Sequence, residues 1–177
     1  YHHLHTHSSI KESDNKLTDT CKIAVIGATG AVGRMFLRIL EERNFPTNNI
    51  RLCASQKSVG KILTVKNQEI PLEYATSELL SEVDIVFVSA NSTVSREIAP
   101  AAVANKAIVI DDSSTFRMDS EVPLVVPEVN ASDLERHKGI ISVPNCSTTP
   151  LVMALNPLHK INPVKRVIVD TYQSVSG

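Results

Sequence analysis

The sequence predicts an α/β fold in which a doubly wound parallel sheet carries helices on both faces. Three observations predict it. Apolar runs of strand length recur along the chain, segments with helical spacing alternate with them, and a glycine-rich turn joins the first run to the first helix. Continuous apolar runs are typical of strands buried on both faces of a parallel sheet, and their alternation with helices is typical of doubly wound folds.

The elements of this sheet follow in order from residue 22. The first strand is KIAVIG, residues 22–27, and the helix after it repeats apolar residues at helical spacing until Asn44 and Pro46 end it. The segment ILTVKNQEIPLEYA, residues 62–75, places KNQ between two extended runs and predicts a hairpin. The remaining elements expected here are strands at 50–55, 84–90 and 107–113 and helices at 31–44 and 93–106, the second bent near Pro100.

Beyond residue 113 the pattern is less regular. We expect an extended segment at 122–130, a short helix at 131–138, a strand at 139–144, a helix at 147–158 and a long strand at 164–177. The last strand has no partner in view, so residues 21–156 are predicted to form a nucleotide-binding domain and 157–177 the start of a truncated second domain. Residues 1–20 hold four of the six histidines without periodicity; we interpret them as a tag or disordered leader rather than a metal-binding tail.

Composition limits the classes of function. The 177 residues carry a net charge of −1, which gives no basic surface for nucleic acid and no polybasic membrane patch. No apolar run approaches the ~20 residues needed to span a bilayer. Three scattered cysteines, Cys21, Cys53 and Cys146, predict neither a disulfide framework nor a metal site, which favours a reducing, cytoplasmic setting.

The turn GATGAVG, residues 27–33, predicts a dinucleotide site. Its glycines follow a strand and open a helix, so that Gly27 permits the turn, Gly30 admits a diphosphate and Gly33 allows close helix–strand packing, as in Rossmann-like folds. The intervening residues assigned to the cofactor are Thr29, Ala31 and Val32.

The second strand predicts which nicotinamide cofactor is used. NAD sites place a carboxylate after this strand, but the sequence there is ASQKSVGK. Ser55, Lys57, Ser58 and Lys61 could accept a 2′-phosphate instead, which favours NADP; a solvated basic turn is the alternative.

Cys146, in the stretch SVPNCSTTP, is the candidate nucleophile. It follows a Pro-Asn turn and precedes a predicted helix, whose dipole would stabilise a thiolate. A thiol beside a nicotinamide suggests addition to an aldehyde, hydride transfer to the cofactor, and release of the thioester by phosphate. Arg117, in DDSSTFR, suits a phosphoryl group as a bidentate partner, and a surface ion pair with Asp112 or Asp119 is the alternative.

Five motifs in order, GATGAVG, SQKSVGK, VPEVN, PNCSTT and TYQSVSG, closely resemble the aspartate-semialdehyde dehydrogenase family from about residue 22 to the last residue. The resemblance implies reversible, phosphate-dependent reduction of L-aspartyl 4-phosphate to L-aspartate 4-semialdehyde by NADPH through a cysteine thioester. The pathway implied leads to lysine, threonine, methionine and isoleucine. The roles implied are nucleophile for Cys146, acyl-oxygen and substrate support for Asn145, substrate orientation for Gln173, phosphate binding for Arg117, and cofactor contact for Ser176 and Gly177.

The chain also departs from the family pattern. Lys57 stands where the family commonly has arginine, and the family's catalytic histidine lies beyond residue 177; His137 and His159 fall outside the motifs. The resemblance further implies a homodimer or homotetramer for the whole enzyme, a small-molecule substrate, and no nucleic-acid or membrane partner.

Three alternatives to this activity remain. One is an NADP-binding module without turnover, and a second is N-acetyl-glutamyl-phosphate reductase, whose cysteine motif favours glycine and an aromatic around the thiol. A short-chain reductase or epimerase is the third, although the Tyr-x-x-x-Lys it needs is missing from YATSE and YQSVS.

Overall fold

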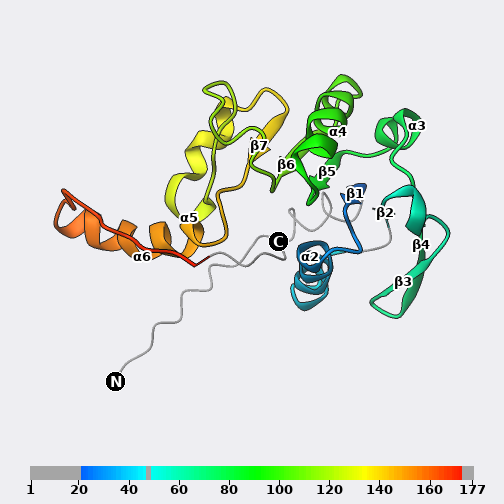
Figure 1. Ribbon diagram of the computed structural model, residues 1–177, viewed down its shortest axis with the longest axis horizontal. Helices are drawn as coiled ribbons and strands as arrows, with labels where there is room; N and C mark the ends of the chain where they lie inside the picture. The colour runs from blue at the N-terminus through cyan, green and yellow to red at the C-terminus, as the bar shows by residue number, and fades with distance from the viewer. Residues whose placement is uncertain (1–20, 47–48, 173–177) are drawn as a thin grey trace.

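The computed structural model describes residues 21–46 and 49–172, which build one seven-stranded sheet. The strand order is β3-β4-β2-β1-β5-β6-β7, and every pair is parallel except the β3–β4 hairpin (Figure 1). The predicted doubly wound sheet is therefore confirmed. The strands are β1 (Ile23–Ile26), β2 (Ile50–Cys53), β3 (Ile62–Val65), β4 (Gln68–Glu73), β5 (Ile85–Val88), β6 (Ile108–Asp111) and β7 (Ile140–Ser142).

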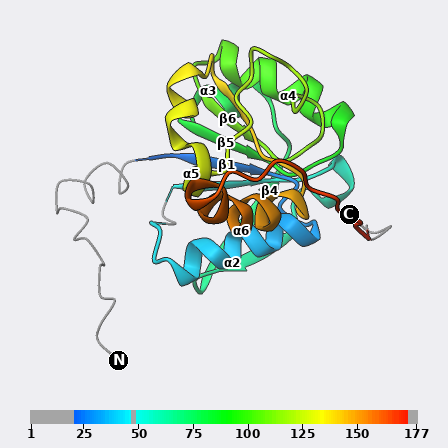
Figure 2. The same cartoon turned by 90° about the vertical axis from the view of Figure 1, so that its left-hand side faces the viewer.

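Helices cover both faces of this sheet. In Figure 2, α2 lies on one side of the strands, and α3 and α4 lie on the other. None of the helices within the described ranges has the length and apolarity needed to cross a membrane. The helices are α2 (Ala31–Glu42), α3 (Ser77–Ser81), α4 (Ser92–Ala104), α5 (Pro127–Asn130) and α6 (Thr148–Ile161), with 3₁₀ turns η1 (Gln56–Ser58) and η2 (Ala131–Arg136).

Each face of the sheet has its own apolar core. On the α2 face, Leu37 and Leu40 pack over Leu52, and the ring of Phe36 stacks on Phe87 with centroids 4.0 Å apart. On the opposite face, Ile98 and other α4 residues pack against strands β5 and β6. Because strand residues alternate between faces, the continuous apolar runs of the sequence supply both cores.

Several predicted elements differ from those observed. The hairpin is confirmed, with Lys66 and Asn67 both at positive φ in its turn, a conformation that two-residue hairpins require. Helix α3 was not anticipated; it begins after Thr76, whose hydroxyl accepts a hydrogen bond from the Leu79 N–H. The 122–130 segment, expected to be extended, ends in the short helix α5, which starts at Pro127, and the 131–138 helix is a 3₁₀ turn.

The end of the chain differs most. Helix α6 begins as predicted, but it lies beyond α5, away from the strands, and none of its residues is buried (Figure 1). Residues 164–172 of the expected long strand form no strand, because no other strand within the described ranges lies beside them to supply hydrogen bonds. Residues 173–177 of that expectation lie outside the described residues.

We predict that Gly33→Ala destabilises the fold strongly. A Cβ at residue 33 would lie 2.3 Å from the Gly27 carbonyl oxygen, and a backbone atom cannot move away cheaply. The expected loss in the free energy of unfolding is about 1–3 kcal/mol or more. Urea denaturation of the chain measures it.

Gly30→Ala is the matched control in the same turn. Its Cβ would meet only the Gly27 carbonyl oxygen, at 3.3 Å, so the expected cost is below about 1 kcal/mol. Equal losses for the two variants would contradict the close packing of helix α2 on the glycine turn.

Candidate functional site

The glycine turn brings three backbone segments together at the carboxyl end of β1. Gly27 has φ +83°, and a Cβ there would lie 2.0 Å from the Ser89 carbonyl oxygen at the end of β5. The Gly27 and Ala28 N–H groups both donate to the Cys53 carbonyl oxygen at the end of β2. Glycine at position 27 is therefore required by the close approach of β1 to β5 as well as by its φ.

The amino terminus of α2 faces this turn. Gly30 is the N-cap residue, no side chain caps the helix, and its first turn carries no acidic residue. The first N–H groups of a helix have no partner within the helix, and the helix dipole places positive charge there. This end of α2 is thus suited to a diphosphate.

A cavity of about 330 Å³ opens over the glycine turn. It lies between the carboxyl ends of β1, β2, β4 and β5, where the helices change from one face of the sheet to the other. This switch point is where doubly wound folds bind dinucleotides. The residues lining it include the predicted Gly27, Thr29, Gly30 and Ser55, together with Tyr74, Asn91 and Glu97.

Tyr74, Asn91 and Glu97 were missed by the sequence reasoning. Tyr74 directly follows β4, whereas Asn91 caps α4 by accepting hydrogen bonds from the Thr93 and Val94 N–H groups. Both stand just beyond the carboxyl ends of strands, which was the available signal.

Three features together fit a dinucleotide: a glycine turn in which no Cβ blocks the approach of a diphosphate, a helix amino terminus without a side-chain cap, and the cavity above them.

Other predicted cofactor residues do not line this cavity. Gly33 is buried against the turn, and Ala31 and Val32 line an apolar groove of about 370 Å³ beside Met35 and Val143. Helical geometry turns these two side chains away from the cavity over the glycine turn and toward this groove, which Asp112 and Val143 also line.

Lys57 and Ser58 belong to the η1 turn, two and three residues after the cavity-lining Ser55. Lys57 is exposed and Ser58 is half-buried. Neither residue lines the cavity, but both follow closely in sequence on Ser55, which does.

Cys146 lies in a turn directly before α6, and its side chain is exposed. The Asn145 side-chain oxygen accepts hydrogen bonds from the Ser147 N–H at 3.0 Å and the Ser147 hydroxyl at 2.7 Å, and the Cys146 thiol lies 3.8 Å from it. The Asn145 carbonyl accepts from the Thr148 and Thr149 N–H groups. Asn145 thereby fixes the turn that presents the thiol at a helix amino terminus.

Arg117 is tied to the segment that leads to this thiol. Its Nε donates to the Val143 carbonyl oxygen and its Nη2 to the Asp112 carbonyl oxygen, both at 2.8 Å. Among the ion pairs of the described residues, none includes Arg117. Burial raises the pKa of the Asp112 carboxyl, and the nearby Arg117 charge opposes that rise. The expected alternative, a surface ion pair, is therefore not what anchors Arg117.

Three predicted site residues, Gln173, Ser176 and Gly177, lie outside the described residues. The two described histidines serve local backbone contacts. His137 Nδ1 accepts from the Gly139 N–H, and His159 Nδ1 accepts from the Val164 N–H.

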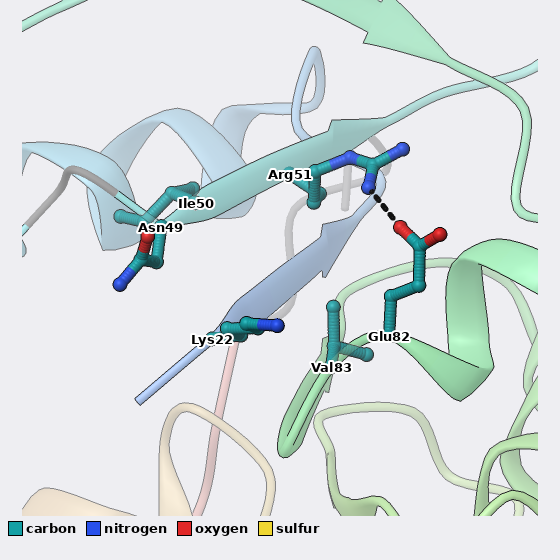
Figure 3. Close-up of a pocket in the computed structure, with 6 residues that line it drawn as sticks. All are labelled: Lys22, Asn49, Ile50, Arg51, Glu82 and Val83. Carbon is teal, nitrogen blue, oxygen red and sulfur yellow. Dashed lines mark hydrogen bonds and ion pairs between the residues drawn. The ribbon is translucent and has the colours of Figure 1, made fainter. Parts of the chain in front are cut away.

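A further cavity, of about 410 Å³, lies at the opposite end of the sheet, where β1 and β2 begin (Figure 3). Arg51 on its wall donates to both Glu73 carboxylate oxygens at 2.6 Å and to Glu82 at 2.7 Å. These carboxylates raise the pKa of Arg51, and the guanidinium lowers the pKa of Glu73. Two carboxylates already engage this guanidinium, and the glycine turn is at the far end of the strands, so the cavity is not part of the candidate site.

Comparison with known proteins agrees with this geometry. Residues 22–137 match the family described as semialdehyde dehydrogenase, NAD binding domain. The chain belongs to this family. The matched residues contain the glycine turn, the η1 turn and Arg117, and Cys146 follows nine residues after them.

Individual relatives carry a more specific name. Aspartate-semialdehyde dehydrogenase of Bacillus subtilis (strain 168) is 50% identical over 155 residues, covering 88% of this chain and 45% of that protein. The chain thus spans about half the length of the curated relatives it matches.

Solved structures agree with the same family. The crystal structure of aspartate semialdehyde dehydrogenase II complexed with ASA, from Vibrio cholerae, superposes with a TM-score of 0.75 at 38% identity, covering 78% of this chain and 46% of that one. The Candida albicans enzyme, solved with NADP, gives a TM-score of 0.66 at 28% identity, covering 82% and 48%.

We predict that Cys146 is alkylated far faster than the other two thiols. Burial raises the pKa of Cys53 to about 12, so its thiolate fraction at pH 8 is on the order of 10⁻⁴. Burial and the Asp84 charge raise the pKa of Cys21. Because the thiolate is the nucleophile, limiting iodoacetamide at pH 8 should label Cys146 first, as read by peptide mass.

The pH dependence of labelling provides the control. The Cys53 rate should still be rising at pH 10, below its pKa of about 12, provided the fold persists. Labelling of Cys53 in urea, at a rate typical of an exposed thiol, verifies that burial is the cause. Equal labelling of Cys53 and Cys146 in the folded chain would contradict the assignment.

Proposed function

We propose that this chain is the cofactor-binding, thiol-bearing part of an aspartate-semialdehyde dehydrogenase. The reaction is the reversible reduction of L-aspartyl 4-phosphate to L-aspartate 4-semialdehyde by NADPH, in the biosynthesis of lysine, threonine, methionine and isoleucine. The observation that carries the proposal is the exposed Cys146 at the amino terminus of α6 in a chain of the NAD-binding semialdehyde dehydrogenase family. Relatives bearing this enzyme name are 42–50% identical over most of the chain.

The chemistry proposed for the chain's residues follows the roles that the family resemblance implies and the exposure of the Cys146 thiol. In the oxidative direction the Cys146 thiolate attacks the aldehyde carbon, and hydride leaves that carbon for the oxidised cofactor, which gives a thioester. Inorganic phosphate then attacks the thioester carbonyl, the C–S bond breaks, and acyl phosphate departs as the thiolate is restored. Asn145 supports the acyl oxygen, Gln173 orients the substrate, and Arg117 binds the phosphate.

The cofactor proposed is NADP. No carboxylate stands between Ser55 and Lys61, where an NAD site places one, and the Candida albicans relative was solved with NADP. Gly27, Thr29 and Gly30 surround the diphosphate, Lys57 and Ser58 hold the 2′-phosphate, and Ser176 and Gly177 complete the site.

The remaining proposals concern the whole protein. Residues 157–177 begin a second, catalytic and dimerisation domain, and the enzyme assembles as a homodimer or homotetramer in the cytoplasm. Light scattering of the full-length protein tests the assembly.

Activity of the full-length protein that carries these residues is the direct test. We predict continuous NADPH formation from L-aspartate 4-semialdehyde and NADP, followed at 340 nm, only when inorganic phosphate is present. Without phosphate, NADPH formation should stop after one equivalent per thiol, because the thioester is not released. Cys146→Ser should lower kcat by about 10³-fold or more, because it removes the nucleophile. Cys53→Ser, which changes a buried thiol, is the matched control and should retain activity when folded. An NADP-binding module without turnover would bind NADP and give no phosphate-dependent signal.

Cofactor preference gives an independent prediction. We expect the chain to bind NADP more tightly than NAD, and Lys57→Glu to erode or invert the preference. Losing a charge-assisted contact weakens binding about ten- to hundredfold. Calorimetric titration with each cofactor measures both affinities.

Lys106→Glu is the control for Lys57→Glu, since it makes the same charge change just beyond the carboxyl end of α4, the end remote from the cavity. It should leave the ratio of the two affinities unchanged. Equal affinity of the unmodified chain for NAD and NADP would contradict the proposal that Lys57 binds the 2′-phosphate.

A further inference from the structure

Asp111, the last residue of β6, is completely buried, and its carboxylate is held by two serines. Oδ1 accepts a hydrogen bond from the Ser95 hydroxyl on α4, and Oδ2 accepts one from the Ser113 hydroxyl, both at 2.7 Å. Among the ion pairs of the described residues, none includes Asp111. Burying a carboxylate without a basic partner is costly, and the two serine hydroxyls are the side-chain donors that offset this cost.

Ser113 connects the Asp111 carboxylate to the loop that contains Arg117. The Ser113 oxygen accepts from the Thr115 N–H at 3.0 Å and lies 2.8 Å from the Thr115 hydroxyl oxygen. A hydroxyl has one proton to donate, and a carboxylate oxygen is a stronger acceptor for it than a hydroxyl oxygen. The Asp111 carboxylate is therefore one of the contacts that orient the 113–117 turn, together with Ser92, whose carbonyl oxygen accepts from the Thr115 hydroxyl at 3.3 Å.

Asp111 also contacts the segment that leads to the thiol. Its carbonyl oxygen accepts from the Val143 N–H at 2.8 Å, and the Val143 carbonyl accepts from Arg117 Nε at 2.8 Å. Val143 lies three residues before Cys146. Asp111 is thus hydrogen-bonded both to Ser113, in the loop that contains Arg117, and to Val143, in the segment between β7 and Cys146.

We propose that Asp111 is a positioning residue that, through Ser113, fixes Arg117 for a phosphoryl group beside Cys146. This inference rests on the proposed function. The ligand is inorganic phosphate in one direction and the phosphoryl group of an acyl phosphate in the other. A carboxylate suits the task because both of its oxygens accept, whereas an asparagine would leave one of the two serines without an acceptor.

The pair Ser113→Ala and Ser95→Ala separates positioning from simple packing. Each removes one buried 2.7 Å hydrogen bond to the same carboxylate, but only Ser113 connects to the Arg117 loop. In the full-length protein we expect Ser113→Ala and Asp111→Asn to raise the KM for phosphate about tenfold. In Ser113→Ala and Asp111→Asn we expect the KM for NADP to stay within about twofold of the unmodified protein. In Ser95→Ala we expect every KM to stay within the same range.

Thiol alkylation provides a second measurement that needs no turnover. Iodoacetate is an anion and iodoacetamide is neutral, so the ratio of their rates at Cys146 reports positive charge beside the thiol. Inorganic phosphate should slow iodoacetate more than iodoacetamide. Ser113→Ala should reduce both the ratio and the effect of phosphate, toward the values of Arg117→Ala, whereas Ser95→Ala should retain them.

The outcomes are distinguishable from failure of the proposed function. If the unmodified enzyme lacks phosphate-dependent activity, the proposed function fails, and the alkylation ratio alone decides the role of Asp111. Equal changes in Ser113→Ala and Ser95→Ala, or no change in Ser113→Ala, would overturn the positioning role. Thermal melting of each variant identifies a protein that has not folded. If Asp111→Asn does not fold, the results for the milder variant Ser113→Ala decide whether Asp111 has a positioning role.

Discussion

Because Gly27 has no side chain, the backbone at the end of β1 approaches the carbonyl oxygen of Ser89 closely. The location of the cavity depends on this close approach. A side chain at residue 27 would meet this oxygen at 2.0 Å, so the turn and the end of β5 could not both keep their positions. The chain leaves β1 toward α2 on one face of the sheet and leaves β5 toward α4 on the other (Figure 2). The cavity over the glycine turn lies between those two departures, at the kind of switch point where doubly wound folds bind dinucleotides.

The turn that bears the candidate nucleophile lies beyond the next two strands. Asp111 ends β6 and Val143 follows β7; the Val143 N–H donates to the Asp111 carbonyl oxygen, and Arg117 Nε donates to the Val143 carbonyl oxygen. The cavity over the glycine turn and the Cys146 thiol thus lie at the carboxyl edge of the same parallel sheet. The η1 turn with Lys57 and the turn with Cys146 follow different strands.

Much of the sheet could be predicted from the sequence because its signals are local. Buried parallel strands appear as apolar runs, and the glycine spacing marks the first turn. Glu97 and the Asp111 bonds could not be predicted, since they depend on partners distant in sequence; Ser95 lies 16 residues from Asp111, and Arg117 lies 26 from Val143. Which side of α2 the Ala31 and Val32 side chains occupy could not be predicted from the glycine spacing alone, and in the structure they line a separate groove. Over its described residues, 164–172, the expected last strand needed a neighbouring strand, and the apolar pattern alone does not show whether one is present.

Trapping the acyl group on the thiol tests the central claim, that Cys146 is the nucleophile of a nicotinamide-dependent dehydrogenase. The full-length protein is mixed with L-aspartate 4-semialdehyde and NADP without phosphate, quenched in acid, and digested for peptide mass analysis. One aspartyl group on the peptide containing Cys146, released when phosphate is added before the quench, is the predicted result. An adduct on the Cys21 or Cys53 peptide, or NADPH formed without any adduct on Cys146, would contradict it.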